Sequence, residues 1–346
     1  DSLGGSVTQR GAIEPLQERR RWKHLVPLAL GALALLGGGF AIGRWVGGSG
    51  AKGAAGSVPS SFQQMTDLPG EERQAQIGPT GTAFVFVSDA SGNPDLYLQR
   101  VGGRNPVNLT ADSPAADTAP SFSPDGERVA FRSDRDGGGI FVMGSTGESV
   151  KRLADFGYDP AWSPDGKQIV FSSGDGQNPW SRDALAQLWV VPSSGGEVRQ
   201  LTQGGDAVQP SWSPGGRRIA FWGLRSDSGQ RDLWTIAADG EPSPVAVTED
   251  AAVDWNPVWS PDGRTLFFAS VRGGSMNLWR VAIDEGTGRP RGEPRPFTTP
   301  SRMSGSISLS RDGRHPMFVS PDQRSTIQRF RLDPATGRVT SPPRPP

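Results

Sequence analysis

The sequence predicts an all-β protein, a six-bladed β-propeller preceded by one N-terminal transmembrane helix. Three observations predict this fold. The 346 residues include 47 Gly and 31 Pro, about twice the average share, so long helices can form little of the chain. One turn sequence recurs at spacings of 40 to 50 residues, and one uncharged apolar run of 19 residues lies near the N-terminus. The repeat favours stacked antiparallel sheets, and the apolar run favours a membrane span.

The apolar run covers residues 25–43. A helix of this length, at 1.5 Å per residue, crosses a hydrocarbon core of about 30 Å. Arg and Lys residues precede it at 19–21 and 23, so the positive-inside rule predicts a cytoplasmic segment 1–24, a helix 25–46 through the inner membrane and a periplasmic or external remainder. A cleaved signal peptide is the alternative, since residues 51–55 are mostly small. Residues 47–61, rich in Gly, Ala and Ser, predict a flexible tether.

The repeat begins after the tether, and we expect the propeller to occupy residues 62–346. Each unit carries the turn Ser-Pro-Asp-Gly, in which the Ser hydroxyl caps the first position, Pro fixes φ and Gly accepts the left-handed conformation. Its copies are Ser123–Gly126, Ser163–Gly166, Ser213–Gly216 with Gly in place of Asp, Ser260–Gly263, Ser310–Gly313 with Arg in place of Pro, and a degraded first copy, Gly78–Gly81.

Each unit has the same four parts. An aromatic stub precedes the turn, an alternating apolar run follows it, a second run comes after a polar loop, and a short stub ends the unit. Four antiparallel strands in 40 to 50 residues are typical of propeller blades. The last unit ends without a clear final stub, so we expect residues 62–66 to supply that outer strand and to pair with residues 327–332, which would close the ring.

The repeats resemble the TolB-type propeller family of PD40 or WD40-like repeats. The resemblance is carried by copies such as residues 160–166 and 257–263, each an aromatic stub joined to the turn, and it covers residues 62 to 340. The order of basic segment, membrane span, tether and repeats also resembles the extracytoplasmic part of bacterial transmembrane serine/threonine kinases. Together the resemblances imply a sensory, scaffolding or binding domain outside the membrane, with any kinase domain absent from this chain.

Two alternatives stay open beside this interpretation. One is a TolB-like periplasmic component of an envelope protein complex, although the α/β domain that precedes the propeller in that family is missing. The other is a carboxylate-based hydrolase or lyase with its site in the channel. The partners expected for a binding domain are an envelope protein, a peptide or a polar small ligand.

Composition narrows the chemistry. The chain has no Cys and two His, His24 and His315, which argues against thiolate chemistry, His-based metal sites and Ser-His-Asp triads. We therefore expect no metal and no cofactor. Asp155–Gly157 matches the DFG sequence of kinases, but no other kinase motif accompanies it. Equal numbers of basic and acidic residues, 36 each, give no reason to expect nucleic acid as a partner.

Two sets of charged residues recur at fixed places in the units. Four Asp precede the repeated Pro by one to four residues, and four Arg follow the strand after the turn; the sets are Asp117, Asp159, Asp206 and Asp254, and Arg132, Arg135, Arg225 and Arg272. A ring would gather both near one mouth of the channel, where they could bind a polar ligand. The alternative is that they pair with one another and cap turns. If they face a ligand, Asp206→Ala and Asp254→Ala should change stability little.

Trp residues also recur at two repeat positions. They are Trp162, Trp212 and Trp259 in the stub before the turn, and Trp189, Trp234 and Trp279 in the later run. We expect them to pack between neighbouring blades.

Overall fold

The computed structural model describes residues 63–176, 178–180, 185–224, 228–240, 243–298 and 305–320, with strand backbone at 331–332 and 339–341. The chain divides at Ser57/Val58, and the unit before this point lies outside the described residues. So does the predicted membrane span at 25–46. Within the described part of the chain, no helix is long and apolar enough to span a membrane.

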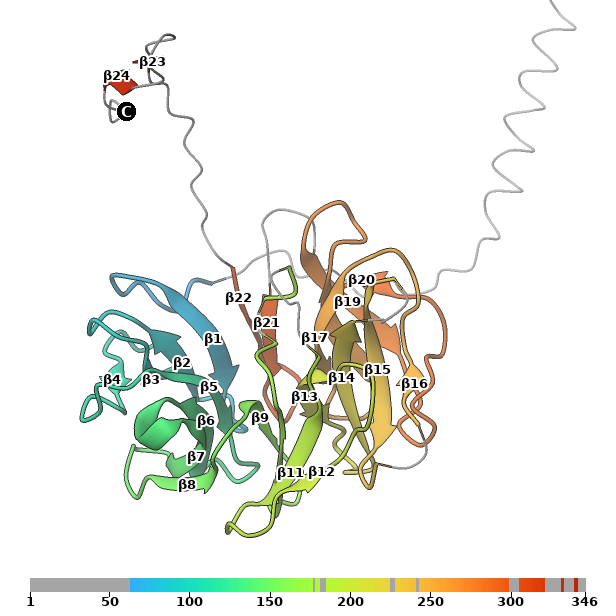
Figure 1. Cartoon of the computed structure of the whole chain (residues 1–346), viewed down its shortest axis with the longest axis horizontal. Coiled ribbons are helices and arrows are strands. Elements are labelled where there is room, and N and C mark those ends of the chain that lie inside the picture. The colour runs from blue at the N-terminus through green and yellow to red at the C-terminus, as the bar shows by residue number, and fades with distance from the viewer. Residues whose placement is uncertain are drawn as a thin grey trace, which may run out of the picture. The chain divides into compact units, whose positions relative to one another are not determined.

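Five antiparallel sheets of four strands follow one another along the chain, as expected for an all-β propeller. Blade 1 contains β1 (Glu72–Ile77), β2 (Ala83–Ser88), β3 (Asp95–Arg100) and β4 (Val107–Asn108); blade 2 contains β5 (Asp117–Phe122), β6 (Arg128–Ser133), β7 (Gly139–Gly144) and β8 (Lys151–Ala154). Blade 3 contains β9 (Tyr158–Trp162), β10 (Gln168–Ser172), β11 (Leu188–Pro192) and β12 (Arg199–Gln200). Blade 4 contains β13 (Val208–Trp212), β14 (Arg218–Leu224), β15 (Arg231–Ala237) and β16 (Val245–Ala246); blade 5 contains β17 (Asp254–Trp259), β18 (Thr265–Ser270), β19 (Asn277–Ala282) and β20 (Arg295–Pro296). The first strand of each blade lies at the centre of the ring (Figure 1).

The expectation of six four-stranded blades is wrong for the described residues. A two-stranded sheet, β21 (Gly305–Leu309) and β22 (Pro316–Val319), occupies the sixth position between β17 and β1. Residues 63–68 form no strand, and β23 (Arg331–Leu332) pairs with β24 (Val339–Ser341). The β23–β24 hairpin closes a much shorter loop than a pairing of β23 with residues 62–66 would close. Forming the hairpin therefore costs less conformational entropy. Phe62 and residues 327–330, the rest of the expected closure, lie outside the described residues.

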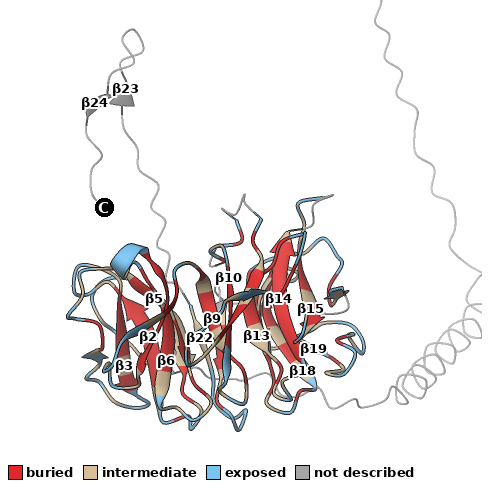
Figure 2. Ribbon diagram, turned by 60° about the horizontal axis from the view of Figure 1, so that its bottom comes forward, coloured by how far each residue is buried: buried red, intermediate tan, exposed pale blue. Residues whose placement is uncertain are grey.

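The core lies in the wedges between neighbouring sheets. Separate apolar clusters join blades 1 and 2, 2 and 3, 3 and 4, and 4 and 5, and two more join the sixth sheet to blades 5 and 1. Buried residues accordingly follow the strands, and exposed residues lie in the loops (Figure 2). The six Trp named above all belong to or pack on these clusters, so the prediction that they pack between blades is confirmed.

Two side-chain contacts recur from blade to blade. In the turn after β9, the Gln168 backbone N–H donates to Ser163 Oγ at 2.9 Å, and Ser163 Oγ donates to Asp165 at 2.6 Å. The same contacts recur in blades 2 and 5. At the end of a unit, a Thr hydroxyl accepts a backbone N–H from the third strand, as Thr248 does from Leu233 at 3.0 Å. The repeat motifs are therefore structural hydrogen-bonding devices.

Candidate functional site

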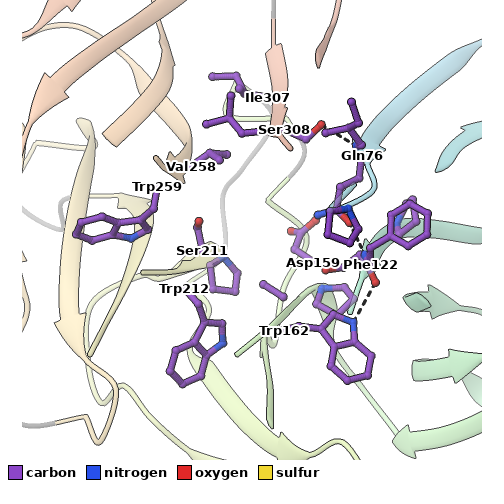
Figure 3. Close-up of a pocket in the computed structure, with 18 of the residues that line it drawn as sticks. Gln76, Phe122, Asp159, Trp162, Ser211, Trp212, Val258, Trp259, Ile307 and Ser308 are labelled. Atoms are coloured by element: carbon purple, nitrogen blue, oxygen red, sulfur yellow. Dashed lines mark hydrogen bonds between the residues drawn. The ribbon is translucent and has the colours of Figure 1, made fainter. Parts of the chain in front are cut away.

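The inner strands surround a cavity of about 530 Å³ along the axis of the ring. All six sheets contribute to its wall, and Figure 3 shows Gln76, Asp159, Ser211, Val258 and Ser308 around it. The wall is of mixed polarity, with Gln, Asn and Ser residues interleaved with Pro, Ala and larger apolar residues. A concave site with convergent polar groups is the usual geometry of a ligand pocket.

A β-bulge interrupts the pairing of every innermost strand with its neighbour. At each bulge one non-glycine residue has a left-handed φ, and that residue lines the cavity. These six residues, which we call the bulge ring, are Gln74 (φ 52°), Ala119 (50°), Asp159 (50°), Gln209 (47°), Asn256 (51°) and Ser306 (48°). Non-glycine residues in this region cost about 1 to 3 kcal/mol each and are concentrated at functional sites.

The amide side chains of the wall have a fixed orientation. The Ala119 backbone N–H donates to Gln74 Oε1 at 2.8 Å, the Ile307 backbone N–H to Asn256 Oδ1 at 2.6 Å, and the Trp222 indole N–H to Gln209 Oε1 at 2.7 Å. The Phe122 backbone N–H contacts Gln76 Oε1 in the same way. These partners are donors only, so the amide atom that faces each must be oxygen.

The amide nitrogens are consequently left on the other branch of each side chain. None of the four, on Gln74, Gln76, Gln209 and Asn256, donates a hydrogen bond to another described residue. The cavity wall therefore carries several amide N–H groups that donate to none of the residues the structure describes.

The described residues of the wall include two charged side chains, Asp159 in the bulge ring and Arg311 at the turn end. Asp159 is 8% exposed, and its Oδ2 accepts the backbone N–H of Gly176 at 3.1 Å. A Cβ added to Gly176 would lie 2.8 Å from Gln209 Cγ, so this loop runs from Asp159 to Gln209. Arg311 replaces the turn Pro of the other units, and its backbone N–H donates to the Pro79 carbonyl at 3.1 Å.

Two of the predicted Asp residues form buried ion pairs. Asp117 and Asp254 are completely buried, and each lies beside the Arg that follows the second strand, Arg135 at 2.7 Å and Arg272 at 2.5 Å. Burial raises the pKa of both carboxyls, and the guanidinium beside each offsets part of that rise. Arg272 also contacts the exposed Asp250 at 2.8 Å. Neither carboxyl lines the described cavity.

The other predicted site residues do not form one group with them. Asp206 is buried and accepts backbone N–H groups from Ala186 at 2.7 Å and Leu224 at 2.9 Å. Arg132 contacts Asp134 at 2.6 Å, and Arg225 lies outside the described residues. Of the predicted Asp and Arg sets, Asp159 is the described residue that lines the cavity.

The sequence interpretation missed the rest of the bulge ring. Asp159 stands directly before the repeated Pro, whereas Asp117 and Asp254 stand three residues before it and Asp206 four, so the Asp set combined different structural positions. The residue directly before the repeated Pro could have identified the bulge ring from the sequence, because this residue is Ala119, Gln209 and Asn256 in blades 2, 4 and 5. Within the described residues no cluster of three or more His, Cys, Asp or Glu could hold a metal ion.

A family comparison follows from the repeats. The family described as PD40, TolB beta propeller domain, matches residues 58–241 and 203–342. The uncharacterized protein Atu1656 of Agrobacterium fabrum is 28% identical over 184 residues, or 51% of this chain and 59% of that protein. The uncharacterized peptidase YuxL of Bacillus subtilis is 29% identical over 189 residues, 42% of this chain and 28% of that protein. The chain thus spans under two thirds of these relatives.

Solved structures with the same fold have different names. A TolB from Acinetobacter baumannii has a TM-score of 0.51 with 24% identity, covering 65% of this chain and 56% of that one. An oligogalacturonate lyase from Vibrio parahaemolyticus has a TM-score of 0.52 with 16% identity, covering 77% and 76%. Such low identities establish the fold and leave the function to the site.

Proposed function

The chain belongs to the TolB β-propeller family, and on that premise we propose that it is a binding module that takes its ligand in the central channel. The observation that carries the proposal is the bulge ring: five blades and the two-stranded sheet β21–β22 each place one residue on the cavity wall at the cost of a left-handed backbone. A merely structural channel would gain stability from Gly at these positions. The strain is explained if the side chains serve a ligand.

The expected partners are an envelope protein, a peptide or a polar small ligand. The proposal further includes the sequence prediction that residues 25–46 anchor the chain in the inner membrane with the propeller outside. In that arrangement the propeller lies outside the membrane and acts as a sensory or scaffolding domain that the helix connects to the cytoplasm. An envelope-complex component remains the alternative role.

Site-specific photocrosslinking tests the channel. A benzoylphenylalanine at Ser211, on the cavity wall, should form adducts with the ligand or partner in cells, and one at the exposed Thr146 in the turn after β7 should not. Mass spectrometry identifies the adducts. Adducts at Thr146 with none at Ser211, in folded protein, would exclude the channel as the binding site.

Cysteine labelling tests the orientation, because the chain has no native Cys. A Thr146→Cys variant should react with a membrane-impermeant maleimide in intact spheroplasts, whereas a Ser6→Cys variant should react only after lysis. Equal labelling of both variants before lysis, or a soluble and shortened product, would contradict the anchor.

A further inference from the structure

We propose that one corner of the channel binds the carboxylate of a small organic acid. The corner lies at the turn end of the cavity, where blade 1 meets the two-stranded sheet β21–β22, and consists of Gln76, Ser308 and Arg311, which we call the donor corner. The inference rests on the proposed channel function and names its ligand class. Its basis is that all three side chains carry hydrogen-bond donors that meet no acceptor among the described residues.

The three residues of the donor corner are neighbours in space. Gln76 belongs to β1, Ser308 belongs to β21, and Arg311 follows the end of β21 by two residues. The Ile77 backbone N–H donates to Ser308 Oγ at 3.0 Å, and the Arg311 backbone N–H donates to the Pro79 carbonyl at 3.1 Å. Figure 3 shows Gln76 and Ser308 side by side on the cavity wall. These contacts hold the corner together on one side of the channel.

The side-chain donors of the corner are open to a ligand. The Phe122 backbone N–H holds Gln76 Oε1, so the amide nitrogen with its two N–H groups lies on the other branch. The buried side-chain atoms that lack a partner do not include this nitrogen, so solvent reaches it. Ser308 Oγ accepts the Ile77 N–H, and its own O–H meets no acceptor in the described part of the chain. Arg311 is exposed, and its guanidinium forms no ion pair with a described residue.

A carboxylate suits these donors better than other groups. The planar guanidinium can donate two parallel N–H bonds to a carboxylate, and the amide and hydroxyl can donate to its remaining lone pairs. A neutral acceptor would leave the charge of Arg311 unmatched. A dianion such as phosphate would bring a second negative charge into a wall that already contains Asp159. The single charge of a carboxylate balances that of Arg311.

The acidic residues nearby do not occupy the donor corner. Neighbouring inner strands contact one another in the order β1, β5, β9, β13, β17, β21 and back to β1, so β9, which carries Asp159, lies across the channel from β21. Asp159 accepts the Gly176 N–H at 3.1 Å and has a further interaction within the chain, so its charge is already engaged. The exposed Asp312 accepts the Ser310 O–H at 2.6 Å and lies outside the cavity wall. The corner is therefore left to an anion from outside.

The size of the cavity favours a small acid. Its volume of about 530 Å³ lies in the range of small-molecule pockets. Beyond the donor corner the wall includes Val258, Ile307 and the turn Pro residues, against which the carbon skeleton of an acid can pack.

Ligand-observed NMR titration of the purified full-length chain tests the ligand class. Lactate, hexanoate and benzoate are each compared with their methyl esters, which lack the charge, and with inorganic phosphate. We expect at least one acid to bind saturably and its ester to bind at least about tenfold more weakly, because the ester loses a charge-assisted contact. Absence of saturable binding by all three acids, an ester that binds as well as its acid, or phosphate binding more tightly than every acid would overturn the inference.

Two variants with matched controls test the residues. Arg311→Gln removes the charge and keeps the backbone N–H, and Gln76→Glu keeps an oxygen for the Phe122 N–H but replaces the amino group by a second oxygen. Both should weaken acid binding at least about tenfold with little change in the urea midpoint. Arg314→Gln and Gln168→Glu make the same charge changes at exposed residues outside the cavity wall and should bind as the parent does. Parent-like binding by both folded corner variants, or an equal loss in their controls, would also overturn the inference.

The outcomes separate this inference from the channel function. If the acids fail to bind but the photocrosslinker at Ser211 still forms adducts, the ligand class is wrong and the channel remains the site. If the acids fail to bind and Ser211 forms no adducts, the channel function itself fails.

Discussion

The turns and the bulges both recur around the ring, but they differ in what is repeated. The Ser-Pro-Asp-Gly turns repeat the same side chains, and each Ser bonds inside its own turn. The bulges repeat only a backbone conformation, and their residues change from Gln to Ala, Asp, Asn and Ser. The turn Asp residues are exposed, although the turn Pro residues also reach the cavity wall, whereas every bulge residue lies on that wall.

This difference separates scaffold from site in a repeat protein. A position that every blade needs for folding keeps the same residue type in its copies, because the same local contact must form in each blade. A position that faces a shared ligand need not, because the six copies contact different parts of it. Identical residues therefore indicate the scaffold, and varied residues at one strained geometry indicate the site.

Removing a buried scaffold charge should have the largest effect. Asp254→Ala leaves the partly buried Arg272 without its buried carboxylate, with Ser270 and the exposed Asp250 as its remaining partners, and we expect the free energy of unfolding to fall by about 3 kcal/mol. Urea denaturation measures it, and Asp250→Ala is the control, expected to cost under about 1 kcal/mol. This outcome replaces the sequence-based expectation that Asp254→Ala is nearly neutral. Equal effects of the two variants would show that the Asp254 ion pair does not stabilise the scaffold.

Two serines test the comparison directly. Ser163 lies in a turn, accepts the Gln168 N–H and donates to Asp165, whereas Ser211 faces the cavity and forms no hydrogen bond to another described residue. Ser163→Ala should destabilise the fold by about 1 to 2 kcal/mol, because a nearly buried N–H loses its acceptor. Ser211→Ala should stay within about 0.5 kcal/mol. Equal shifts of the urea midpoint in Ser163→Ala and Ser211→Ala would contradict the distinction between turn and cavity residues.

The sequence predicts the scaffold well because its signals are local. The turn chemistry, the apolar runs and the Trp positions each depend on a few consecutive residues. The structure confirms the apolar runs as strands in five blades, the Ser–Asp turn contact in blades 2, 3 and 5, and the Trp packing in blades 3 to 5. The sixth blade was predicted by analogy with the others. Its strands after Val319 depend on long-range pairing, and β23 pairs with its local neighbour β24 instead.

The site was predicted less well because it depends on strand register. One extra residue at a bulge decides whether Asp159 faces the cavity or a blade interface, and the strand register that the bulge produces is not visible in the sequence of a single blade. Asp117 and Asp159 were placed in one set, yet the first lies in a buried ion pair and the second on the cavity wall. Their different distances from Pro, three residues and one, were the local sign that they occupy different positions.

Relief of backbone strain should have a smaller effect of opposite sign. Ala119 has φ 50° and no polar side chain to offer a ligand. Ala119→Gly should raise the free energy of unfolding by about 1 kcal/mol, because the left-handed penalty exceeds the extra entropy of Gly in the unfolded chain. Ala161→Gly, at a cavity-lining position that lacks a positive φ, should lower it by about 0.5 to 1 kcal/mol. Destabilisation by both variants would show that the bulge is not strained.

The smallest expected effect is a dependence on acid. Hydrogen bonds from the turn Ser and from a backbone N–H lower the pKa of the turn carboxyls, those of Asp125, Asp165, Asp262 and Asp312, below the usual 3.8. A carboxyl with a lowered folded pKa stabilises the fold above pH 3.8 and loses that contribution as pH falls through the folded value. The raised pKa values of Asp117 and Asp254 act in the opposite direction, because the fold then favours their protonated forms.

Substitution of one turn carboxyl isolates its share of this dependence. Asp165→Asn should flatten the loss of stability between about pH 5 and pH 3, by a few tenths of a kcal/mol because the group is largely exposed to solvent and salt. Asp155→Asn, an exposed carboxyl outside the turns, should leave the curve parallel to the parent. Urea midpoints across this pH range measure both. A steeper acid loss in Asp165→Asn would mean that the turn raises the pKa of this carboxyl, and the turns would then store strain as the bulges do.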